Sequence, residues 1–297
     1  MTIDFKEFAL QVARGNGVES LLPVVEKELI HYDIIRALDE SRWLDRLIFQ
    51  GGTCLRLCYG AVRYSEDLDF TTAEDLTETD LLGFSDIVSR ELEKKYDVSV
   101  RVKEPKKIKE FEGGATMKRW QVVVDTAPAR PDLPSQKIKI EIAHVPSYTR
   151  KMLILQENYP ELEGMNAQVI AGCQSLDEIL ADKVVSFSQQ TAAPRYRDLW
   201  DIPWIASQPG INREDVAEMV AMKIADYQVK EPSASFLAAG EGRAVKLLEG
   251  DILASEMTRF LPDAVLARTV GRANYREAMA HKIEDVFAFV ARSLEAR

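Results

Sequence analysis

The spacing of apolar residues divides the chain into a region with both helical and strand patterns and a region with helical patterns alone. Apolar positions three or four residues apart predict helices over residues 4–14, 19–42 and 80–95. Short alternating runs rich in β-branched residues predict strands over residues 98–102, 120–124 and 138–142. From about residue 211 onward only the helical spacing recurs. We therefore expect a mixed α and β region followed by a helical one.

The turn at Gly51 and Gly52 is the first candidate for ligand binding. Glycine lets the backbone approach a ligand closely, and Thr53 is a residue type that caps the helix-like run that follows. A helix N-terminus presents free N–H groups and a partial positive charge to phosphate. A tight structural turn with a capping threonine explains the same three residues when they are considered alone.

Three carboxylates are predicted to stand on strand faces that are anchored from behind. Side chains alternate along a strand, so Asp67 and Asp69 share one face while Leu68 and Phe70 occupy the other. In the run KIKIEI, Glu141 likewise lies opposite three isoleucines. Carboxylate oxygens are the ligands that Mg²⁺ prefers. Taken alone, KIKIEI is equally typical of an exposed edge strand with solvated charges. The prediction of a metal site therefore depends on the three carboxylates occurring together.

A helix is predicted to begin at Ser175, because Ser175 and Glu178 have capping-box spacing. Lys183 falls on the apolar stripe of this helix and must either extend to solvent or meet an anion. Further along, Asp198 and Asp201 lie three residues apart and share a face if the segment is helical. A charged helical turn stabilised by its own ion pairs is the alternative.

Composition limits the classes of function. A chain of 297 residues exceeds the usual size of one domain, and its net charge of −10 excludes a protein that coats nucleic acid with its whole surface. One local run, residues 101–109, sets five basic residues against one glutamate, a net +4, and is either a track for a phosphate backbone or a solvated loop.

The cysteines and the N-terminus point to a reducing compartment. The three cysteines form no Cys-x-x-Cys pair, and we expect Cys54 and Cys58, four residues apart, to be small core residues. The three histidines are too scattered to predict a zinc site. No signal-peptide pattern opens the chain, and no apolar run approaches the ~18 residues of a membrane span. We expect a cytoplasmic protein without a membrane partner.

Five segments together resemble a known family, and they read FQGGTCLRLCYG, RYSEDLDF, KIKIEI, EILADKVVSF and RYRDLWDI. In this order they resemble the AbiEii/AbiGii family of nucleotidyltransferase toxins, which includes the MenT-type toxins and belongs to the polymerase-β-type nucleotidyltransferase superfamily. The resemblance covers about residues 49–202. It implies an α+β fold, in which a mixed sheet flanked by helices is followed by an all-helical domain.

The resemblance also implies a division into domains. Residues 1–155 would form the nucleotidyltransferase core with its N-terminal helices. Residues 156–297 would form the helical domain, which contributes Lys183 and Asp198 to the active-site cleft.

The resemblance implies a two-metal site for phosphoryl transfer. Asp67 and Asp69 would hold Mg²⁺ on a nucleoside triphosphate, and Glu141 would help to bind the catalytic metal or activate the attacking hydroxyl. The superfamily often has Gly-Ser at the turn and Asp as the third carboxylate, where this chain has Gly-Gly-Thr and Glu. The longer glutamate side chain leaves the metal-binding role of Glu141 open.

The remaining site residues implied by the resemblance bind the nucleotide. Gly51, Gly52 and Thr53 would cradle phosphates, Lys183 would grip them, and Asp198, together with Asp201, would orient the lysine or the acceptor. Arg63 and Ser65 would contact the nucleotide or support the carboxylates, and Ser65 is also a candidate for modification by an antitoxin.

The function implied by the resemblance is that of a nucleotidyltransferase toxin. It would transfer nucleotides from a nucleoside triphosphate to an RNA acceptor, the 3′ end of tRNA, and a cognate antitoxin would counteract it. Two alternatives stay open: transfer to a hydroxyl of a protein or small molecule, and a non-catalytic interaction protein with the same fold.

Overall fold

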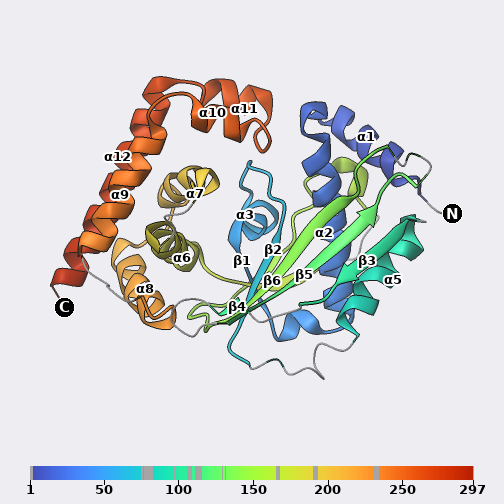
Figure 1. Ribbon diagram of the computed structural model, residues 1–297, viewed down its shortest axis with the longest axis horizontal. Coiled ribbons are helices and arrows are strands. Elements are labelled where there is room, and N and C mark those ends of the chain that lie inside the picture. Colours follow the sequence, from blue (N-terminus) through green and yellow to red (C-terminus); the bar gives the residue numbers. More distant parts are fainter. Residues whose placement is uncertain are drawn as a thin grey trace. The chain divides into compact units, whose positions relative to one another are not determined.

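The chain divides into two compact units. The computed structural model shown in Figure 1 describes residues 3–74, 76, 83–96, 98–105, 109–110, 116–128, 130, 132–164, 168–189, 193–229 and 234–296. By internal contacts, the first unit comprises Met1–Lys109 with Thr116–Cys173, and the second comprises Glu110–Ala115 with Gln174–Arg297. The domain boundary expected between residues 155 and 156 stays a prediction.

The first unit is built on a mixed sheet. Its strands are β1 (Ile48–Gln50), β2 (Leu68–Thr72), β3 (Ser99–Lys103), β5 (Thr116–Asp125), β6 (Gln136–His144), β7 (Lys151–Ile154) and β8 (Ile170–Cys173), in the order β3-β5-β6-β2-β1-β8-β7, and β4 (Lys109–Glu110) pairs with β5 beside this path. The pairs β2–β6 and β1–β8 are parallel, and the pairs β1–β2, β3–β5, β5–β6 and β7–β8 are antiparallel.

Helices complete the first unit. They are α1 (Phe5–Gly15), α2 (Leu22–Glu40), α3 (Gly51–Tyr59) and α5 (Phe84–Tyr96), with short 3₁₀ turns at Glu19–Leu21, Trp43–Asp45 and Pro160–Leu162. The two helices α2 and α5 pack against the sheet and against each other, as Figure 1 shows. The ring of Phe84 on α5 lies 4.7 Å from that of Trp120 on β5 and 5.2 Å from that of Trp43. This packing buries the apolar face of the central strands, so their polar side chains must project from the other face.

The second unit is helical in all its described elements. They are α6 (Leu176–Gln189), α7 (Tyr196–Ala206), α8 (Arg213–Asp226), α9 (Ala234–Leu248), α10 (Ile252–Met257), α11 (Asp263–Arg268) and α12 (Ala273–Glu295). The long helix α12 packs against α7, α8 and α9, with Phe287 and Phe187 meeting edge to face at 6.4 Å. Inside the bundle, the ammonium of Lys223 lies 2.8 Å from Glu178 and 3.4 Å from Asp182.

The structure confirms the predicted order of elements. The helix expected over residues 19–42 is α2 with a preceding 3₁₀ turn, and the strand expected at 120–124 is the centre of the longer β5. The expected start of the third helix, residues 80–82, lies outside the described residues. The short strands β7 and β8 were missed, because four-residue runs give little periodicity. Within the described residues, no helix is long and apolar enough to cross a membrane.

Candidate active site

The glycine turn connects β1 to α3 in close contact with a carboxylate. Gly51 has φ +75, a conformation that favours glycine, and a Cβ added there would lie 2.4 Å from Oδ2 of Asp69. A Cβ on Gly52 would lie 2.5 Å from Nη2 of Arg63 and 2.8 Å from Oγ of Ser65. The turn therefore needs glycine at position 51, a side chain at position 52 would displace Arg63 and Ser65, and three polar side chains converge on the turn.

Thr53 has a different role from the one expected. The helix begins at Gly51, with Gln50 as its N-cap residue and no side-chain cap, so Thr53 lies inside the first turn. Its buried hydroxyl donates to the backbone carbonyl of Asp67. The capping prediction was wrong because the N-cap residue is Gln50, three residues before Thr53. Thr53 instead ties α3 to the loop that leads into β2.

The three predicted carboxylates are neighbours on one side of the sheet. In the antiparallel pair β1–β2, Gln50 lies opposite Asp69, and in the parallel pair β2–β6, Asp69 lies opposite Glu141. Paired residues point to the same face, so the Asp69 and Glu141 side chains are adjacent. Asp67 directly precedes β2, and the alternate residues Leu68 and Phe70 are buried. The alternation predicted from the sequence is the one observed.

Two basic side chains that the sequence did not single out contact these carboxylates. Nε of Arg119 on β5 lies 2.6 Å from Oε1 of Glu141, and Nζ of Lys139 on β6 lies 3.5 Å from Oδ2 of Asp67. Both basic side chains are nearly half exposed, at 45% and 44% of their full accessibility. Ion pairs with this exposure are weak, so both cations are free to exchange their carboxylate for another anion.

This set of ligands fits a hard divalent cation. Carboxylates are acceptor-only groups when ionised, and three of them, Asp67, Asp69 and Glu141, lie on or next to adjacent strands β2 and β6. All three are partly exposed, so an ion can reach them from solvent. Oxygen-rich sites of this kind suit Mg²⁺, Mn²⁺ or Ca²⁺ rather than thiophilic metals.

The predicted lysine of the second unit meets anions. Nζ of Lys183 on α6 lies 2.8 Å from Oδ1 of Asp198 and 2.7 Å from Oδ2 of Asp201, both on α7, and all three side chains are buried. Arg195, not singled out from the sequence, also pairs with Asp198. Burial alone raises the pKa of Asp198, but Lys183 and Arg195 outweigh it and hold that pKa well below its usual range. The Asp198 carboxylate is therefore ionised at neutral pH.

Sequence comparison identifies the family. The family described as nucleotidyl transferase AbiEii toxin, of the type IV toxin–antitoxin system, matches residues 33–289 of the chain. The chain belongs to this AbiEii family. It is accordingly a nucleotidyltransferase of a toxin–antitoxin family, whose members use a nucleoside triphosphate and a divalent metal and are paired with a cognate antitoxin. Among curated protein sequences, none matches the chain.

One solved structure supports the fold. MenT4, a nucleotidyltransferase toxin from Mycobacterium tuberculosis, is similar with a TM-score of 0.64 at 17% identity, over 96% of this chain and 98% of that one. Two structures from Helicobacter pylori, a nucleotidyltransferase and JHP933, have TM-scores of 0.47 at 18% identity, over 92% of this chain and 96% and 94% of theirs. The likeness to MenT4 confirms the predicted α+β fold with its helical C-terminal part.

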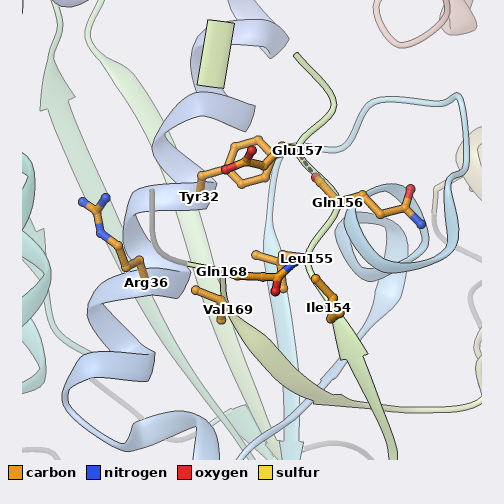
Figure 2. A pocket seen from close by; sticks show the side chains of 8 residues that line it. All are labelled: Tyr32, Arg36, Ile154, Leu155, Gln156, Glu157, Gln168 and Val169. Carbon is orange, nitrogen blue, oxygen red and sulfur yellow. Dashed lines mark hydrogen bonds between the residues drawn. The ribbon is translucent and has the colours of Figure 1, made fainter. Parts of the chain in front are cut away.

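A cavity in the first unit of this AbiEii protein is lined by residues other than those of the predicted site. The cavity has a volume of about 330 Å³ and lies between α2, the end of β7 and the start of β8. Figure 2 shows the side chains that line it, which are Tyr32, Arg36, Ile154, Leu155, Gln156, Glu157, Gln168 and Val169. None of these residues belongs to the predicted site. The hydroxyl of Tyr32 donates to the Gln156 carbonyl at 2.7 Å, which ties the wall of the cavity to α2. The cavity therefore lacks the carboxylate ligands that nucleotidyl transfer needs.

Proposed function

We propose that this AbiEii protein is a cytoplasmic Mg²⁺-dependent toxin that transfers nucleotides from a nucleoside triphosphate to the 3′ end of tRNA. A cognate antitoxin would counteract it. The observation that carries the proposal is the register that sets Asp69 beside Glu141, next to a helix-initiating glycine turn. This combines ligands for a metal with backbone N–H groups for a phosphate.

The carboxylates supply the metal site in this proposal. Asp67 and Asp69 would hold Mg²⁺ on the triphosphate, and Glu141 would complete a second metal position or accept the proton of the attacking hydroxyl. When bound, the metal supplies charge neutralisation for the phosphoryl group and stabilises the entering and leaving oxygens.

The turn and its neighbours would bind the phosphates. The first N–H groups of α3 are not used within the helix, and the helix dipole makes this end positive. The buried guanidinium of Arg63 lies against Gly52 and adds a full positive charge at the same place. Ser65, also against Gly52, offers a hydroxyl. Because Gly51 and Gly52 lack side chains, the Asp69, Arg63 and Ser65 side chains lie directly against the backbone of the turn.

Lys183 would complete the phosphate site from the second unit. Its ammonium is held between Asp198 and Asp201, which fixes its position. A lysine that is oriented beforehand loses less entropy when it binds a phosphate. Its meeting with Asp67 and Asp69 in one cleft is part of the proposal.

A basic sheet face supports a polyanionic acceptor. Across the strands β6, β5 and β3, Lys139 pairs with Gln121, which pairs with Lys103. Two residues earlier on β6, Lys137 pairs with Val123 on β5, which in turn pairs with Arg101 on β3. Because paired residues share a face, these four cations lie on the same face of the sheet as Asp69 and Glu141.

This face runs from the carboxylates to the edge strand β3. Arg119 on β5 pairs with Glu141, and Lys139 on β6 lies beside Asp67, so basic side chains adjoin the carboxylates on both strands. Neutralising several phosphates in a row is how proteins bind nucleic acid without reading its sequence. Residues 106–108 of the predicted basic run, which include Lys106 and Lys107, lie outside the described residues. The protein is acidic overall, yet basic side chains are grouped on this face. This grouping favours RNA over a neutral small molecule as the acceptor.

The experiment that tests the proposal follows labelled nucleotides. The purified protein is incubated with Mg²⁺, each labelled nucleoside triphosphate and total RNA with protein extract, and the labelled polymer is identified by electrophoresis. We expect label at the 3′ end of tRNA and none with Asp69→Asn. Label on protein or on a small molecule alone would overturn the choice of acceptor.

A matched pair of variants tests the basic face. Lys103→Glu on β3 should reduce labelling of RNA and make the remaining activity more sensitive to salt. Lys94→Glu makes the same charge change at an exposed position of α5, which packs against the opposite face, and should act like the wild type. Equal losses in the two variants would contradict an RNA track on this face.

A further inference from the structure

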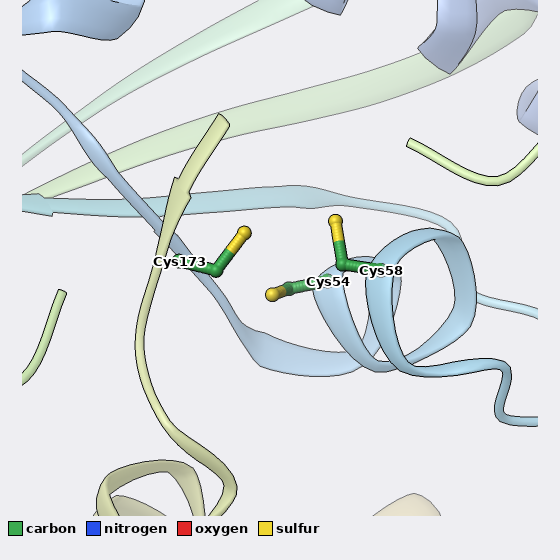
Figure 3. Close-up of side chains that lie close together, drawn as sticks. All are labelled: Cys54, Cys58 and Cys173. Atoms are coloured by element: carbon green, nitrogen blue, oxygen red, sulfur yellow. The ribbon is translucent and has the colours of Figure 1, made fainter. Parts of the chain in front are cut away.

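All three cysteines of the chain gather in the first unit. Cys54, Cys58 and Cys173 are buried, and their Sγ atoms all lie within 4.8 Å of one another. Figure 3 shows Cys54 and Cys58 projecting from α3 beside Cys173 at the end of β8. The sequence suggested core residues only, because nothing in their spacing places Cys173 near the other two.

Backbone structure fixes this arrangement. Cys54 and Cys58 are one turn apart, so they share a face of α3. Cys173 lies opposite Phe49 in the parallel pair β1–β8, and β1 continues directly into α3. The helical turn therefore places the sulfur atoms of Cys54 and Cys58 side by side, and the strand register brings that of Cys173 to them.

Simple core packing does not require this geometry. Cysteine serves in cores as a small apolar residue, and any such residue would fill the same volume. Packing alone gives no reason for three sulfur atoms to face one another. Here the sulfur atoms of all three side chains lie within 4.8 Å of one another, so the three side chains form one cluster.

The geometry fits one thiophilic ion. With metal–sulfur bonds of ~2.3 Å, three sulfurs in a plane around an ion stand about 4 Å apart, so small side-chain rotations close the observed spacing. Within the part of the chain that the structure describes, no histidine, carboxylate or further cysteine joins the group. Structural zinc takes four ligands, whereas thiolates also select Cu(I), which three sulfurs satisfy.

We propose that Cys54, Cys58 and Cys173 form a binding site for one Cu(I) ion. Three copper–sulfur bonds form, and the thiol protons leave to solvent. The proposed copper site does not depend on the proposed acceptor or on the carboxylates. Its ligands are sulfur atoms in the core, whereas the carboxylate ligands are oxygen atoms on the sheet face. It would add a copper-responsive element directly behind the helix that begins at the glycine turn.

The test is a copper titration of the reduced, full-length protein without oxygen. Bathocuproine disulfonate competes for Cu(I), native mass spectrometry counts bound copper, and X-ray absorption identifies the ligands. We expect one copper per chain with sulfur ligands only, and loss of that copper in Cys54→Ala, Cys58→Ala and Cys173→Ala. Zn(II), titrated in parallel, should bind more weakly.

Controls keep the test decisive. Met152→Ala removes a sulfur exposed on β7 and should bind copper like the wild type. Circular dichroism checks that each variant is folded. Even if the cysteine variants unfold, Cu(I) should protect all three wild-type thiols from alkylation. The proposal is overturned if the wild type takes up no stoichiometric copper, if its thiols stay reactive with Cu(I) present, or if folded cysteine variants keep the copper.

Discussion

Replacing Gly51 with alanine tests whether the glycine turn holds Asp69 in its working position. The substitution has two separate effects in the structure. It forces alanine into a left-handed conformation at φ +75, and it places a Cβ 2.4 Å from Oδ2 and 3.0 Å from Cβ of Asp69. The first effect acts on stability, and the second acts on the carboxylate that we propose as a metal ligand.

The two effects have different magnitudes. A left-handed conformation costs a residue with a side chain about 1–2 kcal/mol. Real Cβ atoms essentially never approach another atom to 2.4 Å, so the Asp69 carboxylate must move away. A displacement of roughly 1 Å at a reacting centre costs about 100-fold in rate. Gly51→Ala should therefore lose modest stability and most of its activity.

Gly17 provides the matched control. It has φ +63, so Gly17→Ala carries a similar backbone cost, and no atom lies within 4 Å of the added Cβ. Urea unfolding measures stability, and the initial rate of labelled nucleotide transfer measures activity. Both variants should lose similar stability, but only Gly51→Ala should lose activity. If Gly51→Ala transfers nucleotides as fast as Gly17→Ala, the turn does not position a catalytic carboxylate.

Other substitutions probe the remaining parts of the site. Glu141→Gln should raise the Mg²⁺ concentration needed for activity, as a magnesium titration shows, and an unchanged requirement would remove Glu141 from the metal site. Arg119→Ala should lower the Mg²⁺ concentration needed for activity, because it frees Glu141 from an ion pair. Lys183→Met should abolish transfer and cost about 3–5 kcal/mol in urea unfolding, because it leaves Asp198 and Asp201 buried without their cation. A fully stable Lys183→Met would contradict that cost.

Features of the site set by local periodicity could be predicted from the sequence. The alternation of Asp67 and Asp69 with Leu68 and Phe70 depends only on the geometry of one strand, and the structure shows it. The same reasoning placed Lys183 on a buried helix face, where a charged group needs a partner. The assignment of the family came from ordered motifs, and the comparison confirms it.

Features set by register could not be predicted in this way. Arg119 meets Glu141 because β5 and β6 pair antiparallel with these two residues opposite, and a shift by one residue would turn Arg119 to the other face. Cys173 reaches Cys54 through the pairing of β8 with β1, which joins distant parts of the chain. Such contacts depend on which strands pair, and single-strand periodicity does not specify that.

Stability at mildly acidic pH provides a test of the loop that leads into the carboxylates. His31 on α2 is buried, and its Nε2 donates to the Glu66 carbonyl at 3.1 Å, one residue before Asp67. Burial lowers the pKa of His31 from 6.5 to about 4, although the Glu66 carbonyl opposes the shift. Between these values the unfolded chain binds a proton that the folded protein excludes, so stability falls as pH drops from 6.5 to 4.

The size of this loss follows from the shift, at 1.36 kcal/mol per pKa unit, and comes to about 3 kcal/mol. Carboxylates titrate in part of the same range, so the informative quantity is the difference between the wild type and His31→Gln, in which that position no longer titrates. In urea unfolding, the wild type should lose about 3 kcal/mol more than His31→Gln between neutral pH and pH ~4. His281→Gln, at an exposed position of α12, should follow the wild type. Parallel pH profiles for the wild type and His31→Gln would mean that His31 is solvated in the folded protein, and that α2 does not hold the Glu66 carbonyl through a neutral imidazole.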